Sequence, residues 1–327
     1  MTGGAAPDDH AAGVIGVGSM GRHHARVYSE LPASELVGVT AADEERGATV
    51  ANEFGTQPRD RADLLDRADA VSVAVPTPVH AETVASCIDR GVDVLVEKPF
   101  VEDLDVGADL ASRADDAEVT VQVGHIERYN RATRVAADVV RDLDVVGVDV
   151  RRLGPPLDRD NEDPVVKDLM VHDVDILLSL VDGDIQSIEA TARDERHATA
   201  QFRFENGCVA TLTASRLTHQ KVRQLSITAL SCRVNVDFIS QTVEIHRRSL
   251  PEYVESNGEI RYRNESVVER PMVENGEPPK AEVSSVLEAA SEGTDPIVIA
   301  EEALEVLDVA NRIESEALAA TTRVTTT

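Results

Sequence analysis

The chain has 327 residues, of which 42% are hydrophobic, so it is long enough for two domains that each bury a core. No apolar run is long enough to cross a bilayer, and the small, acidic residues at the start lack the features of a secretory signal. Sixty acidic residues oppose 32 basic ones, and the net charge of −28 disfavours binding to nucleic acid or to an anionic membrane. We therefore expect a cytoplasmic globular protein without either partner.

The composition also indicates the conditions in which the protein works. Only four of the basic residues are lysines, and the chain has no tryptophan. Scattered acids with few lysines are expected of a halophilic protein in a salt-rich cytoplasm, where ions screen the repulsion. Cys87, Cys208 and Cys232 lie far apart without metal-ligand spacing, so we expect reduced core thiols.

Residues 1–12 are expected to form a disordered tail, and strands and helices alternate from there to residue 123. The apolar runs predict strands at 14–17, 36–40, 71–75, 93–96 and 119–123, separated by helices at 20–31, 44–54, 80–90 and 104–113. Continuous apolar runs are typical of parallel strands buried on both faces. This alternation predicts an α/β fold in which residues 13–123 form a Rossmann dinucleotide-binding domain, a doubly wound parallel sheet.

Residues 124–327 follow another pattern, and we expect them to form a substrate-binding and oligomerisation domain. Helices are predicted at 130–143, 165–180, 280–292 and 300–318, and strands at 147–153, 185–192, 198–204, 208–215, 224–229, 233–238 and 242–247. Glu205-Asn206-Gly207 predicts a hairpin, whereas the polar stretch 252–277 is expected to be a long connection. Successive strands without helices between them predict an α+β domain with a large, mainly antiparallel open sheet.

A glycine motif directly follows the first strand and opens the first helix. In Gly16-Val17-Gly18-Ser19-Met20-Gly21 the first glycine permits the tight turn, the second lets a pyrophosphate approach the backbone, and the third lets the helix pack on the strand. The helix N-terminus supplies N–H donors for phosphates. We expect Gly16, Gly18, Ser19, Met20 and Gly21 to bind the cofactor.

The acid that usually binds the adenine ribose is missing from its expected place. Ala41 occupies that position, and Asp43 follows two residues later. Without a carboxylate there, a 2′-phosphate is not repelled, and Arg46 could pair with one. Ala41 and Arg46 are therefore candidate cofactor contacts, and the choice between NAD and NADP stays open.

Two further strand ends carry candidate residues. Pro76, Thr77 and His80 follow the 71–75 strand, where they would meet the nicotinamide ribose, and a proline-capped helix start is the structural alternative. Glu97 and Lys98 end the 93–96 strand, at the edge where open α/β sheets bind ligands. Both are candidate cofactor contacts, and the Lys98 ammonium could also polarise a substrate hydroxyl.

The helix predicted from residue 165 carries Asp168, His172 and Asp175. Spacing of i, i+4 places Asp168 and His172 on one face, where a carboxylate can orient an imidazole for proton transfer. We expect His172 to accept a hydroxyl proton and both residues to contact substrate. A metal site is the alternative, but no third ligand is placed by spacing, so we expect no metal.

The segment Gly124-His125-Ile126-Glu127-Arg128-Tyr129-Asn130 joins the two predicted domains. His125, Arg128 and Asn130 are candidate substrate contacts, Arg128 especially for a phosphate or carboxylate. An ordinary linker is the competing interpretation.

Together these motifs resemble the glucose–fructose oxidoreductase/inositol dehydrogenase (Gfo/Idh/MocA) family. The resemblance rests on the glycine motif followed by His24, on Pro76-Thr77-Pro78-Val79-His80, on Glu97-Lys98-Pro99 and on the helix from Asp168 to Asp175. It implies that Lys98, Asp168 and His172 are catalytic, and that the fold is a Rossmann domain followed by an α/β domain. The open sheet of that second domain commonly packs in dimers or tetramers.

Within that family the chain is most similar to the UDP-N-acetylglucosamine 3-dehydrogenase branch, which also tends to carry a methionine at the position of Met170. That similarity implies hydride transfer from a sugar C3 hydroxyl to NAD or NADP. A dehydrogenase of free sugars or inositols is the alternative, and a non-catalytic ligand sensor is a third interpretation. We expect a small-molecule sugar or nucleotide-sugar substrate and a homodimer or homotetramer.

Overall fold

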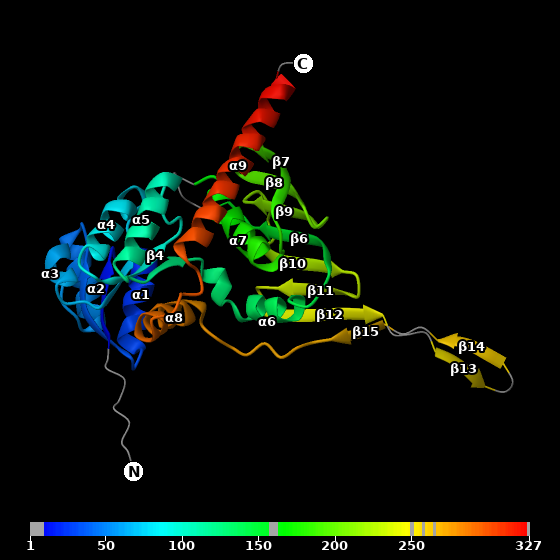
Figure 1. The fold of residues 1–327 in the computed structure, drawn as a ribbon, viewed down its shortest axis with the longest axis horizontal. Helices are drawn as coiled ribbons and strands as arrows, with labels where there is room; N and C mark the ends of the chain where they lie inside the picture. The colour runs from blue at the N-terminus through cyan, green and yellow to red at the C-terminus, as the bar shows by residue number, and fades with distance from the viewer. Residues whose placement is uncertain (1–9, 157–162, 249–251, 257–258, 264–265, 326–327) are drawn as a thin grey trace, which may run out of the picture. The chain divides into compact units, whose positions relative to one another are not determined.

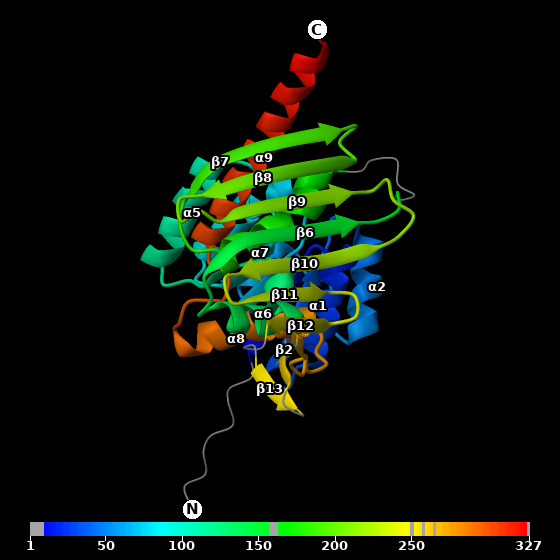
Figure 2. The same cartoon turned by 90° about the vertical axis from the view of Figure 1, so that its right-hand side faces the viewer.

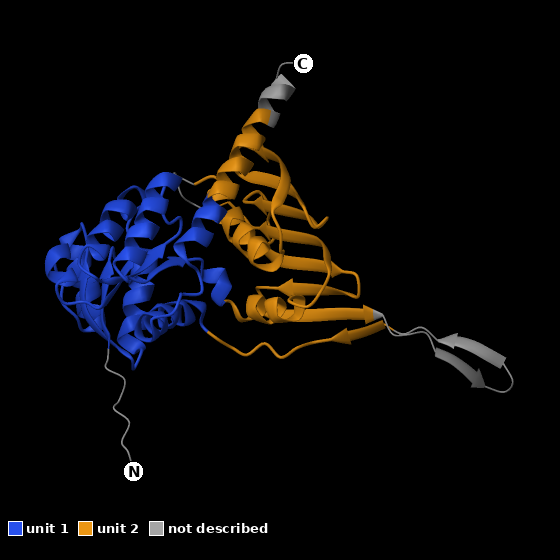
Figure 3. Ribbon diagram, in the orientation of Figure 1, with its two compact units in different colours: residues 1–129, 277–307 blue, residues 130–276, 308–327 orange. Residues whose placement is uncertain are grey.

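The computed structural model describes residues 10–156, 163–248, 252–256, 259–263 and 266–325. The chain divides into two compact units, shown in different colours in Figure 3. Unit 1 comprises residues 1–129 and 277–307, and unit 2 comprises residues 130–276 and 308–327. The sequence analysis placed residues 277–307 in the second domain, whereas these residues belong to the same compact unit as the N-terminal part of the chain.

Unit 1, whose helices and β4 are labelled in Figure 1, contains a parallel sheet of five strands in the order β2-β1-β3-β4-β5. This arrangement confirms the predicted doubly wound fold, because each strand is followed by a helix and the strand order reverses beside β1. The strands are β1 (His10–Ile15), β2 (Ser34–Thr40), β3 (Ala70–Val73), β4 (Asp93–Glu97) and β5 (Val121–Gly124). The helices between them are α1 (Ser19–Glu30), α2 (Glu44–Phe54), α3 (Arg61–Leu65), α4 (His80–Ile88) and α5 (Leu104–Asp116).

The first strand begins earlier than the sequence indicated. Residues 1–12 were expected to form a disordered tail, but His10, Ala11 and Ala12 lie in β1 and pair with β2, and residues 1–9 lie outside the described residues. The backbone N–H of His10 donates to the carbonyl oxygen of Ala33 at 3.0 Å. A histidine and two alanines carry no apolar pattern of their own, so the start of β1 could not be recognised from its residues.

The helix α8 (Pro278–Glu292) completes the core on one side of this sheet. Its residues Val283, Val286 and Leu287 are buried in one cluster with Val14 and Leu95 of the strands. The first turn of α9 (Ala300–Thr325) joins the cluster on the other side, and the backbone N–H of Val123 donates to the carbonyl oxygen of Val298 at 3.2 Å. The C-terminal segment therefore stabilises the N-terminal sheet.

Unit 2 is built on a sheet of eight strands in the order β15-β12-β11-β10-β6-β9-β8-β7, seen face-on in Figure 2. Only the β6–β9 pair is parallel among these described strands, which confirms the prediction of a mainly antiparallel sheet. The strands are β6 (Val145–Leu153), β7 (Ile185–Arg193), β8 (His197–Phe204), β9 (Val209–Ser215), β10 (Val222–Ala229), β11 (Cys232–Asp237), β12 (Thr242–Arg248) and β15 (Ser266–Glu269).

Two helices, α6 (Arg131–Val140) and α7 (Val171–Leu180), pack on one face of this sheet. Residues alternate along the strands: in β8 Ala198, Ala200, Phe202 and Phe204 are buried, whereas Gln201 and its outward-facing neighbours are not. This period of two is expected of a sheet covered on one face.

The stretch 252–277 is not the continuous long connection that was expected. It contains β13 (Glu252–Ser256) and β14 (Glu259–Arg263), which pair with each other, and β15, which pairs with β12. All four residues of β15 are exposed. An edge strand without a buried face lacks the apolar alternation by which strands are recognised, which explains why the sequence pattern missed it.

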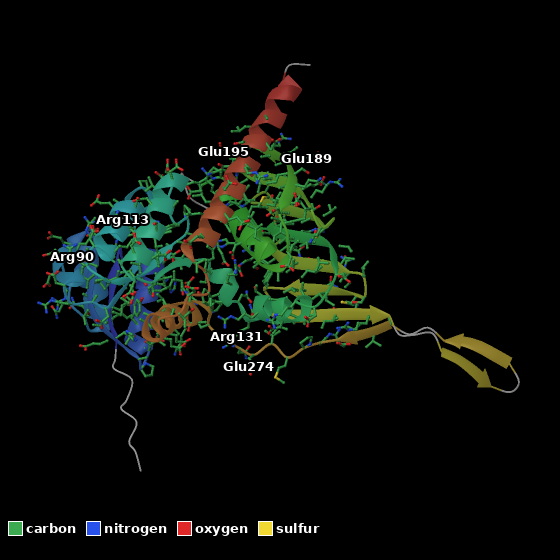
Figure 4. All side chains as sticks on the ribbon, in the orientation of Figure 1. Arg90, Arg113, Arg131, Glu189, Glu195 and Glu274 are labelled. Atoms are coloured by element: carbon green, nitrogen blue, oxygen red, sulfur yellow. The ribbon has the colours of Figure 1, made fainter. Side chains whose placement is uncertain are left out.

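Charged side chains cover the surface of both units, as the sticks in Figure 4 show. Arg113, labelled in unit 1, donates to Asp89 at 2.8 Å, and Arg90 lies 3.6 Å from Asp66. Exposed ion pairs of this kind contribute little to stability individually.

Candidate active site

The glycine turn between β1 and α1 has the geometry that a dinucleotide requires. Gly16 has a φ of +94°, and a Cβ at this position would lie 2.5 Å from the carbonyl oxygen of Ala74. A Cβ on Gly21 would lie 1.7 Å from the carbonyl oxygen of Gly16, so the helix can approach the turn only without a side chain. Around Gly18, by contrast, no atom lies within 4 Å of a built Cβ.

The exposed start of α1 faces this open space. Gly18 caps the helix without a side-chain hydrogen bond, and no acidic residue lies in the first turn. Gly18 and Ser19 are exposed and Met20 is half-buried. The N–H groups of this turn can therefore bind a phosphate, and a nicotinamide dinucleotide fits the residues present.

The end of β2 presents no free carboxylate. Ala41 directly follows the strand, and the side chain of Asp43 accepts a 3.0 Å hydrogen bond from the backbone N–H of Arg46 as the N-cap of α2. Arg46 itself is exposed in the first turn of this helix.

His80 is a buried link between two strand ends. One ring nitrogen lies 2.9 Å from the carbonyl oxygen of Val75, and the other lies 3.0 Å from that of Pro99. The ring thus joins the turn after β3, which contains the exposed Pro76 and the half-buried Thr77, to the residues that follow Lys98. These contacts give the ring a structural role, and the cofactor contact expected of His80 stays a prediction.

Glu97 is the last residue of β4, and Lys98 follows it at the same carboxyl edge of the sheet as the glycine turn. The structure therefore brings together, within unit 1, the residues predicted from four strand ends: Gly18 after β1, Ala41 after β2, Thr77 after β3 and Lys98 after β4. Ligands of open α/β sheets bind at this edge.

The junction residues have defined structural contacts. His125 is buried, and Arg128 donates to Glu302 of α9 at 3.2 Å. Asn130 is the N-cap of α6 and accepts a 3.0 Å hydrogen bond from the backbone N–H of Ala132. At Arg128 and Asn130 these contacts support the competing interpretation, in which the segment is an ordinary linker.

In unit 2, the helix that carries Asp168 and His172 is not uniform. Residues Val166–Met170 form a π-helical segment, and α7 begins at Val171. The sequence analysis expected one continuous α-helix from residue 165. A π-helical turn is wider than an α-helical one and recurs at functional sites. Asp168 lies in the π-helical segment and the half-buried His172 lies in the first turn of α7.

Arg216 holds the Asp168 side chain, and the sequence analysis missed this residue. It directly follows β9, is buried, and donates through Nη2 to the Asp168 carboxylate and through Nη1 to the carbonyl oxygen of Asp163 at 2.6 Å. The guanidinium favours an ionised, oriented Asp168. No local pattern could have indicated this contact, because the two residues lie 48 positions apart.

A second buried arginine supports the neighbouring residue. Arg152 of β6 donates through Nε to Asp173 Oδ1 at 2.7 Å, and both side chains are buried. Asp175 is fully buried as well. Within the described part of the chain, no group of three or more histidine, cysteine or acidic residues is arranged to hold a metal, and no helix is long and apolar enough to cross a membrane.

Comparisons with known proteins match both parts of the chain. Residues 11–125 match the model of an oxidoreductase family with an NAD-binding Rossmann fold, and residues 146–235 match a GFO/IDH/MocA C-terminal domain. The UDP-N-acetylglucosamine 3-dehydrogenase of Acidithiobacillus ferrooxidans is 33% identical over 242 residues, which cover 72% of this chain and 76% of that protein.

A solved structure of that dehydrogenase has a TM-score of 0.84 and 28% identity, with 95% of this chain and 98% of that one covered. An inositol 2-dehydrogenase of Rubrobacter xylanophilus is 32% identical over 192 residues, which cover 54% of each chain.

Proposed function

This chain belongs to the Gfo/Idh/MocA family of NAD-binding oxidoreductases, and from that premise we propose that it removes hydride from a sugar secondary hydroxyl, C3 of a UDP-N-acetylhexosamine. The observation that carries the proposal is the similarity to a UDP-N-acetylglucosamine 3-dehydrogenase, at 33% identity over 242 residues. The residues that the family resemblance marks as catalytic, Lys98, Asp168 and His172, are all present.

In the proposed reaction a bound nicotinamide serves as the hydride acceptor. The Nζ ammonium of Lys98 donates a hydrogen bond to the substrate hydroxyl oxygen and stabilises negative charge on it. A ring nitrogen of His172 accepts the hydroxyl proton as the ketone forms. The alcohol thus loses one proton to His172 and one hydride to the nicotinamide. Asp168, held by Arg216, orients the imidazole and stabilises its protonated form.

The cofactor proposal includes NADP as well as NAD. It is supported by Ala41, which brings no carboxylate to the adenine ribose, and by Asp43, whose carboxylate caps α2. Arg46 would then pair with a 2′-phosphate.

A dehydrogenase of inositol or a free sugar is the second candidate, since an inositol 2-dehydrogenase is 32% identical over 192 residues. A screen of cofactor reduction separates the two candidates. UDP-N-acetylglucosamine, free hexoses, pentoses and inositol are each offered at high salt with NAD+ and with NADP+. Our proposal requires the highest kcat/KM for the UDP-sugar, and preference for inositol would favour the second candidate.

We further propose that the open face of the eight-stranded sheet forms a dimer or tetramer. Val209, which is 45% exposed and alternates with the buried Ala210 and Leu212 of β9, gives this face apolar contact area. Light scattering after gel filtration tests the oligomer. The net charge of −28 supports a cytoplasmic, salt-adapted protein, whose thermal midpoint should rise with KCl.

A further inference from the structure

Three titratable side chains meet in the interior of unit 1, beside the end of β4. His24 comes from α1, Glu97 from β4 and Glu282 from α8. His24 Nε2 lies 3.4 Å from Glu97 Oε1 and 3.9 Å from Glu282 Oε2. His24 and Glu282 are fully buried, and the Glu97 side chain is 16% exposed. Two carboxyl groups thus lie near one imidazole nitrogen in a largely buried position.

The surroundings of this cluster are polar but offer few hydrogen bonds to its side chains. Among the described residues, neither ring nitrogen of His24 and neither side-chain oxygen of Glu282 has a hydrogen-bond partner. Gln122 of β5 donates to the backbone carbonyl oxygen of Glu282 at 2.9 Å, not to its carboxyl. A Cβ on Gly124 would lie 3.4 Å from Glu97 Oε2, so β5 also closes over Glu97.

The charged and titratable neighbours come from each packed element. His23 acts on His24 from α1, and Tyr28 of the same helix lies near Glu282 and contacts Ser72 of β3 at 3.0 Å. The positive charge that acts on Glu97 is that of Lys98, whose backbone N–H also donates to the Glu97 carboxylate. The cluster is therefore linked directly to the proposed catalytic lysine.

Three charges cannot be held together in this environment, because burial penalises each charged form. Burial raises the pKa of Glu97 to about 7, and burial and the negative charge of Glu97 raise the pKa of Glu282 well above its usual value. Burial lowers the pKa of His24 to about 4. Near neutral pH His24 is therefore neutral, ionisation of Glu282 is disfavoured, and Glu97 gains or loses a proton with small changes in pH.

We infer that His24, Glu97 and Glu282 form a proton-sharing cluster that sets the charge of Lys98, with Glu97 as a positioning residue. Ionised Glu97 stabilises the Lys98 ammonium, and the ammonium in turn favours ionised Glu97, because the interaction is reciprocal. Ionised Glu97 also opposes the ionisation of Glu282, so the two carboxyl groups lose their protons one after the other. The catalytic consequence rests on the proposed function, whereas the sharing of protons does not.

Infrared difference spectroscopy between acidic and alkaline pH tests the cluster without substrate or cofactor. The wild-type protein should show a protonated-carboxyl band that disappears with a midpoint near pH 7 and is absent from Glu97→Gln. A second protonated-carboxyl band, which titrates at higher pH in the wild type, should be absent from Glu282→Gln, because burial and the negative charge of Glu97 raise the pKa of Glu282. Glu288→Gln, an exposed change on the same helix, is the matched control and should leave both bands unchanged.

The pH dependence of kcat/KM then tests the link to Lys98. Without the Glu97 charge the ammonium loses its proton more easily, so Glu97→Gln should move the alkaline limb to lower pH by about one unit, whereas Glu288→Gln should not. A merely structural Glu97 would lower the thermal midpoint and leave the limb in place, which would overturn the inference. Absence of the second, higher-pH carboxyl band from the wild type would overturn it as well. A wrong substrate assignment would leave the infrared result intact, so the two failures are distinguishable.

Discussion

Arg152 Nε donates to Asp173 Oδ1 at 2.7 Å, and the exposed fractions of the two side chains are only 5% and 1%. The pair joins β6 to the helix residue that directly follows His172. A buried pair of this kind is weak evidence for net stability, but the loss of one partner leaves a buried charge uncompensated.

We therefore expect Asp173→Asn to lower the free energy of unfolding by about 3–5 kcal/mol. Arg152→Met combined with Asp173→Leu should cost less than either single change, since no charge is left behind. Chemical denaturation of the wild type, Asp173→Asn, Arg152→Met, Asp173→Leu and the double variant measures both effects. The control is Arg141→Ala, which removes an exposed pair with Asp138 and should cost at most about 1 kcal/mol. If Asp173→Asn and Arg141→Ala lowered the free energy of unfolding equally, this would contradict the expected cost of leaving Arg152 as an uncompensated buried charge.

The glycine motif offers a pair of matched substitutions. Gly21→Ala should destabilise the protein strongly, because its Cβ would lie 1.7 Å from the Gly16 carbonyl oxygen. Gly18→Ala meets no atom within 4 Å, so it should leave the thermal midpoint nearly unchanged and weaken dinucleotide binding. Calorimetric titration with NAD+ and NADP+, beside thermal melts, separates the two effects. Unchanged affinity in Gly18→Ala would show that the dinucleotide does not approach this turn.

Ala41→Asp should change the cofactor preference. A carboxylate beside the adenine ribose accepts from its 2′-hydroxyl and repels a 2′-phosphate. We expect the ratio of the Kd for NADP+ to that for NAD+ to rise by about tenfold or more, which is roughly 1.4 kcal/mol. The control is Ala42→Asp, an exposed neighbouring change. A ratio that stays constant in Ala41→Asp would remove Ala41 from the cofactor site.

His24 should make stability depend on pH in the acidic range. Its pKa falls from 6.5 in the unfolded chain to about 4 because burial opposes the charged form. Its contribution is therefore complete above pH 6.5 and is lost as the pH falls toward 4. His24→Gln should show a smaller loss of thermal midpoint over this window than the wild type. His219→Gln, a change at an exposed histidine in unit 2, should keep the wild-type dependence. If the two variants behave alike, His24 does not titrate with this shift.

The sequence predicted the features that depend on local pattern. The apolar runs located the strands of both sheets except β15, and the motif at Gly16, Gly18 and Gly21 indicated the turn, because glycine spacing reflects backbone geometry directly. The matching family models bear out the family.

Contacts between distant parts of the chain could not be predicted in this way. Arg216 reaches Asp168, and Glu282 reaches His24, only after the chain has folded, and neither has a sequence signature. The helix α8 lies close to its predicted residues 280–292, but it packs on the sheet of unit 1 and does not belong to the second unit. An amphipathic pattern does not identify the surface that a helix covers, so this packing could not be predicted.

The most direct test of the proposed activity is the reduction of NAD+ or NADP+ by UDP-N-acetylglucosamine at high salt, with the wild type, Lys98→Met and His172→Gln compared. We expect turnover by the wild type that is slowed by deuterium at the sugar C3. Both variants should lose turnover and retain dinucleotide affinity. Full turnover in Lys98→Met, or no reduced cofactor from the UDP-sugar with the wild type, would contradict it.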